Sequence, residues 1–116
     1  DMLPVVPENM LMREAMNVLS RKNLGIIVAV NQHGKVSGVF TTGDLMRLLE
    51  KGKNFLEKPL LNYASTKPKT ITPEVLAAKA LNIMETHSIT CLVVTDLENH
   101  PIGIAQIYSI LRSGVY

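Results

Sequence analysis

Apolar residues recur along this chain at helical spacing in two places, and each place is followed by a short apolar run. The residues at helical spacing are Met12, Ala15, Met16 and Leu19, and again Ala77, Ala80, Leu81 and Met84. The runs Ile26–Val30 and Cys91–Thr95 are rich in β-branched residues, which predicts strands buried on both faces. Thr72 and Pro73 predict the start of the helix in the second half, as its N-cap and first residue.

Polar turns at 31–35 and 96–100 end these runs and lead to two further predicted strands, Val36–Thr41 and Pro101–Gln106. A short helix is expected at the end of each half, at 45–51 and at 107–112. One more helical turn is predicted at 60–64.

The two halves are copies of one unit. A shift of 65 positions aligns Ala15 with Ala80, Asn17 with Asn82, Val28 with Val93, Gly38 with Gly103 and Arg47 with Arg112. Each half reads strand, helix, strand, strand, helix, and each is small for a separate core. We therefore expect an α/β (α+β) fold in which two β-α-β-β-α repeats, 1–51 and 70–116, pack about a pseudo-two-fold axis. A linker at 52–69 joins them, and clefts are expected where they meet.

Composition excludes several classes of protein. A nucleic-acid binder needs a strongly basic surface and aromatic rings that stack on bases. With a net charge of +2 and 4% aromatic residues, this chain has neither, so nucleic-acid binding is excluded. We expect no membrane span, because no stretch reaches ~20 apolar residues, and no secretion signal opens the chain. The single cysteine, Cys91, fits a reducing cytoplasm. Because the chain begins with Asp1, we expect it to be part of a longer protein.

The clearest chemical signal is the segment GVFTTGDL at 38–45. An ionised Asp44 offers two acceptor oxygens, which match the two adjacent hydroxyl donors of a ribose. Thr41 adds a hydroxyl, and Thr42 and Gly43 are expected to expose backbone N–H groups to a phosphate where the helix begins.

The same residues also fit a capping box, in which Thr41 is the N-cap and Asp44 reaches back to it. The second repeat has Gln106 and Ser109 at the equivalent positions, although its helix must begin at the same place. A cap alone would be expected in both halves, so both interpretations stay open. The second cleft lacks the carboxylate that a ribose needs, and we expect one strong site per chain.

Other reactive residues form no recognisable site. His33 and His100 are expected in turns, and neither they nor His87 has metal-ligand spacing. Cys91 is expected to be a small buried residue. No catalytic motif is found, so we predict no catalytic residue and no metal.

A repeated β-α-β-β-α unit with G-x-x-T-x-x-D leaving its last strand resembles the CBS domain, and the tandem pair resembles a Bateman module. The family's entry into its second repeat is similar to Lys67-Pro68-Lys69-Thr70-Ile71-Thr72-Pro73. Three segments resemble the C-terminal CBS pair of D-arabinose 5-phosphate isomerases: Arg21-Lys22-Asn23-Leu24-Gly25, the segment 38–45, and Leu111-Arg112-Ser113-Gly114-Val115.

In that family a sugar-isomerase (SIS) domain precedes the pair and interconverts ribulose 5-phosphate and arabinose 5-phosphate for the synthesis of Kdo, a sugar of lipopolysaccharide. The resemblance implies a regulatory region without cofactor or catalysis, which senses a nucleotide or nucleotide-sugar, CMP-Kdo foremost, and reports to the SIS domain. An adenine-nucleotide sensor remains an alternative. So does a dimerisation module without a ligand, and a homo-dimer or higher oligomer is expected.

The resemblance also implies the pocket. Its expected residues are Val5, Val6, Asn23, Leu24, Gly25, Thr41, Thr42 and Asp44. Further candidates in the second repeat are His87, Ser88 and Thr90. Gly25 fits a tight turn between helix and strand equally well, whereas for His87 a cation at a helix C-terminus is favoured over a contact with a ligand phosphate.

Overall fold

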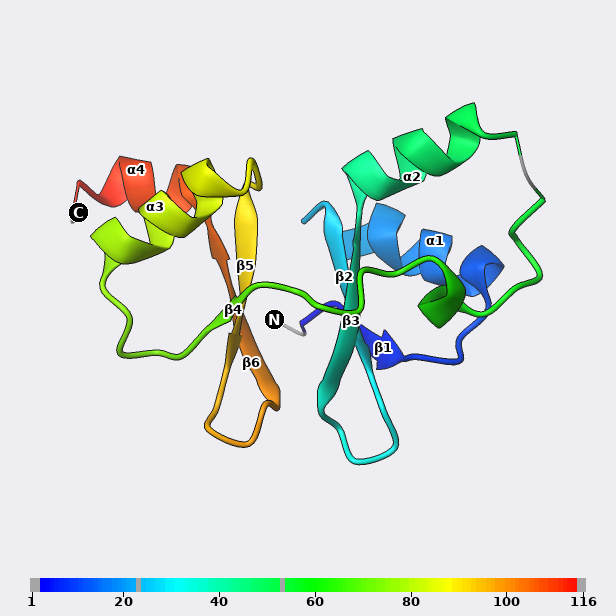
Figure 1. The fold of residues 1–116 in the computed structure, drawn as a ribbon, viewed down its shortest axis with the longest axis horizontal. Coiled ribbons are helices and arrows are strands. Elements are labelled where there is room, and N and C mark those ends of the chain that lie inside the picture. Colours follow the sequence, from blue (N-terminus) through cyan, green and yellow to red (C-terminus); the bar gives the residue numbers. More distant parts are fainter. Residues whose placement is uncertain (1–2, 23, 53, 115–116) are drawn as a thin grey trace. The chain divides into compact units, whose positions relative to one another are not determined.

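The structure, a computed structural model, describes residues 3–22, 24–52 and 54–114. The chain divides into two compact units, Asp1–Pro68 and Lys69–Tyr116 (Figure 1). The first contains β1 (Val5–Pro7), α1 (Met12–Lys22), β2 (Ile26–Val30), β3 (Val36–Thr41), α2 (Thr42–Glu50) and the 3-10 turn η1 (Leu60–Asn62). The second contains β4 (Thr70–Ile71), α3 (Ala77–Thr86), β5 (Cys91–Thr95), β6 (Pro101–Gln106) and α4 (Ile107–Ser113).

Each unit has the same three-stranded sheet. The strand orders are β1-β2-β3 and β4-β5-β6, with the first pair parallel and the second antiparallel in both. Within each unit, both α-helices lie on the same side of the sheet (Figure 1). Even the register irregularity recurs, between Ala29 and Val30 in β2 and between Val94 and Thr95 in β5. The predicted repeat is confirmed, whereas its packing about a pseudo-two-fold axis stays a prediction.

The apolar periodicity identifies the cores. In the first unit the buried core residues of α1 and the sheet are Val6, Met12, Ala15, Leu19, Ile27, Ala29 and Phe40, with Leu48 from α2. In the second unit Ala80, Met84 and Leu92 form a smaller core. The predicted first helix, both apolar strands and the helical turn near 60–64 are confirmed.

The segment at 52–69, predicted as a linker, packs against the first repeat. Phe55 and Leu60 are buried in its core. Leu60 N–H donates to Met10 O at 2.7 Å, and Ser65 N–H donates to Val39 O at 2.7 Å. The compact first unit therefore includes this segment up to Pro68. The boundaries 1–51, 52–69 and 70–116 describe the repeats and stay a prediction.

The predicted start of the helix in the second half is wrong. The helix α3 begins at Ala77, and its N-cap Leu76 makes no side-chain cap. Val75 N–H instead donates to Thr72 O at 3.1 Å, which closes a turn with Pro73 at its second position. Pro73 suits that position as well as a helix start, because its fixed φ serves both.

The helix α2 begins at Thr42, three positions before the predicted start, because a cap forms at the end of β3. The helix α4 ends at Ser113, and Gly114 follows in the left-handed conformation with φ 68°. None of the helices within the described residues has both the length and the apolar character that crossing a bilayer requires.

Candidate functional site

A complete capping box joins β3 to α2. Thr41 Oγ1 accepts the Asp44 N–H at 3.2 Å, and Asp44 Oδ2 accepts the Thr41 N–H at 2.8 Å. Thr41 has extended backbone angles, φ −114° and ψ 167°, so its hydroxyl can turn back over the first helical turn. The capping interpretation of this segment is therefore confirmed. It leaves open whether the same carboxylate also holds a ligand.

Asp44 has capacity beyond the cap. Its Oδ1 accepts one hydrogen bond from Arg47 Nη2 at 2.5 Å, and its side chain is 25% exposed. A carboxylate offers about four acceptor positions over its two oxygens. With one position filled on each oxygen, Asp44 can still accept hydrogen bonds from a ligand that approaches from solvent.

Fewer backbone amides are available at the start of α2 than the sequence predicts. Thr42 N–H donates to Gly25 O at 3.1 Å, and Asp44 N–H is held by Thr41. The expectation that Thr42 exposes its N–H is therefore wrong, because the preceding turn uses it. A helix cannot satisfy its own first four N–H groups. Here those of Thr41, Thr42 and Asp44 have partners, which leaves Gly43 N–H, among the described residues, for a ligand.

Part of the expected pocket does come together. Ile26 pairs with Thr41 in the sheet, which brings Leu24 and Gly25 beside the start of α2. A Cβ at Gly25 would lie 3.5 Å from Thr42 Oγ1. Gly25 has φ +75°, so the turn itself requires a glycine. Asn23 lies outside the described residues.

The structure does not bring Val5 and Val6 to this place. They pair with Val28 and Ala29 in β2, and β2 lies between their strand and β3. The side chain of Val6 is buried in the core. Both residues border an open groove of about 700 Å³ at the hairpin end of the sheet. Its lining is Val5, Val6, Pro7, Glu8, Asn9, Val30, Asn31, Gln32 and His33.

The glycine that opens G-x-x-T-x-x-D has a packing role that sequence reasoning missed. A Cβ at Gly38 would lie 3.0 Å from Ala64 Cβ and 3.0 Å from Ser65 O, so only a glycine admits this close approach. Its repeat equivalent, Gly103, has its nearest neighbour, Val94 Cβ, at 3.6 Å. The asymmetry of the two glycines has no local signal in the sequence.

In the second unit the backbone geometry recurs without the cap. Ile107 N–H donates to Thr90 O at 2.8 Å, as Thr42 does to Gly25. Gln106, the N-cap of α4, makes no side-chain cap, and Ser109 has no carboxylate. The further candidates are exposed: His87 follows α3 as its C-cap, Ser88 has φ 55°, and Thr90 precedes β5.

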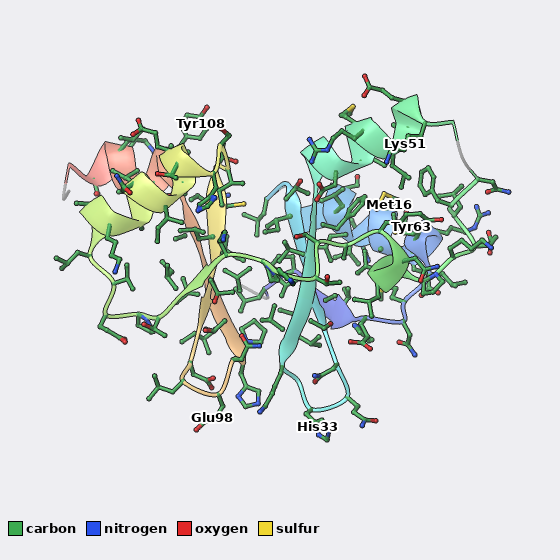
Figure 2. The ribbon with its side chains drawn as sticks, viewed as in Figure 1. Met16, His33, Lys51, Tyr63, Glu98 and Tyr108 are labelled. Carbon is green, nitrogen blue, oxygen red and sulfur yellow. The ribbon has the colours of Figure 1, made fainter. Side chains whose placement is uncertain are left out.

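One grouping was missed by the sequence analysis. Asp96, Glu98 and His100, in the β5–β6 hairpin, bring ligand atoms within 4.8 Å of one another; Figure 2 shows Glu98 at the tip of this hairpin. Asp96 Oδ1 accepts the N–H groups of Glu98 at 2.9 Å and His100 at 2.8 Å. These hydrogen bonds, that from His100 foremost, hold the pKa of Asp96 below its ordinary value. An Asx-type turn accounts for this grouping.

Two other expectations concern single residues. His33 lies exposed at the tip of the β2–β3 hairpin, as Figure 2 shows, which agrees with a turn histidine. Cys91 is half-buried in β5, and burial raises the pKa of its thiol.

Comparison with known proteins decides the family. Residues 2–51 and 61–115 each match the model of the CBS domain. The chain belongs to the CBS domain family. The match covers both structural repeats, so the chain is a tandem CBS pair.

The curated relatives of this CBS pair are isomerases. It is 40% identical over 101 residues to arabinose 5-phosphate isomerase KdsD of Pseudomonas aeruginosa, covering 87% of this chain and 31% of that protein. It is 31% identical over 115 residues to KdsD of Escherichia coli K12, covering 99% of this chain and 35% of that protein. The CBS pair thus spans about a third of the length of these relatives.

Solved CBS pairs share the fold. The pair of protein MJ0100, in complex with 5′-methylthioadenosine and S-adenosyl-L-methionine, has a TM-score of 0.86 at 20% identity, covering 98% of this chain and 89% of that one. CBS domain protein PAE2072 from Pyrobaculum aerophilum, complexed with AMP, has a TM-score of 0.83 at 21% identity, covering 94% and 88%. At these identities the likeness shows the tandem CBS architecture.

Proposed function

We propose that this CBS pair is a regulatory module that binds one nucleotide at the start of α2 and reports its presence to an isomerase domain of a longer parent chain. The observation that carries the proposal is the Asp44 carboxylate. It is oriented by the Thr41 N–H at 2.8 Å, it is 25% exposed, and its counterpart in the second repeat is Ser109. We expect the module to act in the cytoplasm, since its only cysteine is the free Cys91.

The chemistry supports a ribose at Asp44 together with Thr41, Thr42, Leu24 and Gly25 as its surroundings. Two adjacent hydroxyl groups can donate to the two oxygens of one carboxylate. Hydrogen bonds to a charged group contribute about 1.5–3 kcal/mol each. In the proposed site Gly25 leaves one side of the ligand without a covering side chain.

The relatives support the choice of ligand. The KdsD relatives are arabinose 5-phosphate isomerases. The family resemblance implies that the product of such an enzyme leads to Kdo, so CMP-Kdo is our first choice as an end-product signal. PAE2072 is complexed with AMP, which makes an adenine nucleotide the second choice. A ligand controls the isomerase only if it binds two conformations with different affinity, and ~1–3 kcal/mol of coupling is typical.

A thermal-shift series on this chain tests the proposal with CMP-Kdo, CMP, AMP and S-adenosylmethionine. A ligand at 100 times its dissociation constant stabilises the folded state by about 2.7 kcal/mol. Asp44→Asn keeps a carbonyl oxygen for the Thr41 N–H but loses the charge, and it should weaken binding about tenfold or more. Ser109→Ala is the matched control and should bind as the wild type does. If Asp44→Asn binds as tightly as the wild type, the assignment of Asp44 to the binding site is wrong.

A second candidate function is self-association. The helix α2 exposes Met46 and Leu49, each 54% accessible, and α4 exposes Tyr108 at 71% and Leu111 at 44%. Met46 and Leu111 are repeat equivalents, so both units present an apolar residue at the same helical position. We propose a second copy of this chain as the partner. Sedimentation equilibrium of Met46→Ser with Leu49→Ser should then give a monomer where the wild type gives a dimer. A wild-type monomer at all concentrations would contradict this.

A further inference from the structure

The Asp44 carboxylate has a partner that the ribose argument does not use. Arg47 Nη2 donates to Asp44 Oδ1 at 2.5 Å, one helical turn further along α2. The Arg47 side chain is 67% exposed, and this is its only hydrogen bond among the described residues. Because a guanidinium has five N–H donors in a planar fork, most of its donors face solvent beside Asp44.

The guanidinium of Arg47 lies close to Gly43. A Cβ built at Gly43 would lie 3.6 Å from Arg47 Nη1 and 3.7 Å from Nη2. The guanidinium therefore lies over the first turn of α2, next to the one amide of that turn that has no partner among the described residues, Gly43 N–H. A carboxylate and a cation with free donors thus lie side by side, as the ribose and the phosphate do in a nucleotide.

The second repeat provides a natural comparison. The equivalent of Arg47 is Arg112, which is also exposed, but Ser109 replaces the carboxylate and Tyr108 replaces the glycine. Arg112 forms no ion pair among the described residues. The arrangement of cation, carboxylate and bare helical turn is therefore confined to the first repeat.

We propose that Arg47 is a specificity-determining residue that selects ligands carrying a phosphate or another anionic group next to the sugar held by Asp44. The inference rests on the proposed function, because it assumes a sugar at Asp44. Without ligand, Arg47 neutralises the carboxylate. With an anionic ligand, its free donors bind the anion, and a neutral nucleoside gains nothing from it.

Paired affinities test this assignment. Isothermal titration of the wild type, Arg47→Gln and Arg112→Gln is carried out with AMP against adenosine and with CMP against cytidine. Arg47→Gln should weaken binding of the nucleotide about tenfold, which corresponds to about 1.4 kcal/mol. It should leave the nucleoside affinity unchanged or slightly higher, because Asp44 loses a competitor. Arg112→Gln removes the same net charge and should leave both affinities, and their ratio, unchanged.

Two further variants sharpen the result. Arg47→Lys keeps the charge without the fork and should retain part of the preference for the nucleotide. Asp44→Asn should weaken nucleotide and nucleoside alike. If the ratio of nucleotide to nucleoside affinity is the same in Arg47→Gln and the wild type, the specificity role is wrong while the sugar site stands. The role is equally wrong if Arg112→Gln changes the ratio as much. If the wild type binds none of the four compounds and CMP-Kdo gives no thermal shift either, the proposed function itself fails.

Discussion

Gly38→Ala separates packing from ligand binding in the G-x-x-T-x-x-D segment. The added Cβ would lie 3.0 Å from both Ala64 Cβ and Ser65 O, where ordinary contacts begin near 3.4 Å. The Ser65 carbonyl cannot easily withdraw, because it accepts the Val39 N–H at 3.0 Å and Ser65 N–H donates back to Val39 O at 2.7 Å. Overpacking of this kind costs about 1–3 kcal/mol. We expect the upper part of that range, since relief would break two hydrogen bonds.

The matched control is Gly103→Ala. Its Cβ would meet Val94 Cβ at 3.6 Å, an ordinary contact, and its backbone is not in the left-handed region. Replacing such a glycine stabilises a protein by about 0.4–1 kcal/mol through the unfolded state. The two substitutions at equivalent strand positions should therefore differ in sign.

Urea unfolding followed by far-UV circular dichroism measures this difference, because the chain has no Trp for fluorescence. A shift of the melting temperature by about 4 °C or more per kcal/mol gives an independent readout. Equal free energies of unfolding for Gly38→Ala and Gly103→Ala would refute the reasoning. It would mean that the segment at 64–65 yields to the new methyl group at no cost.

Two further predictions follow from single hydrogen bonds. Thr41→Ala removes the acceptor of the Asp44 N–H and should lower the free energy of unfolding by about 1 kcal/mol, whereas Gln106→Ala, at an N-cap without a side-chain bond, should change it far less. An equal loss in both variants, measured by urea unfolding, would contradict the capping role. The pKa of Asp96 is lowered below 3.8, first by the His100 N–H, so its contribution to stability is complete above that pH and is lost as the pH falls through the folded-state pKa. Melting temperatures from pH 7 to pH 2 should show Asp96→Asn below the wild type near neutrality and converging with it below about pH 4, and a pH-independent gap would argue against the linkage.

The repeat and most of its elements could be read from the sequence. Met12, Ala15 and Leu19 carry the periodicity of α1, and the β-branched run Ile26–Val30 forms β2 as expected. These signals are local, since helical spacing and β-branching act through near neighbours. The capping box of Thr41 and Asp44 is readable for the same reason, because its partners lie three positions apart.

Local signals were insufficient where one motif serves two structures. Thr72 and Pro73 suit a helix start and a turn equally, and here they form the turn that leads from β4 towards α3. The pairing of β4 with β5, Thr70 beside Val93, sets where this turn lies. Such pairing joins residues that are far apart in the chain, so the residues near Thr72 do not predict it.

The sequence by itself determined the repeat, the order of elements and the one carboxylate that distinguishes the first repeat. Only the tertiary structure decided that Gly38 is needed against Ala64 and Ser65, and that the turn at Gly25 uses the Thr42 N–H. The physical reason is the same in both cases. A close approach between two segments, or a hydrogen bond between them, depends on both segments at once. The sequence of one segment does not predict where the other segment will pack.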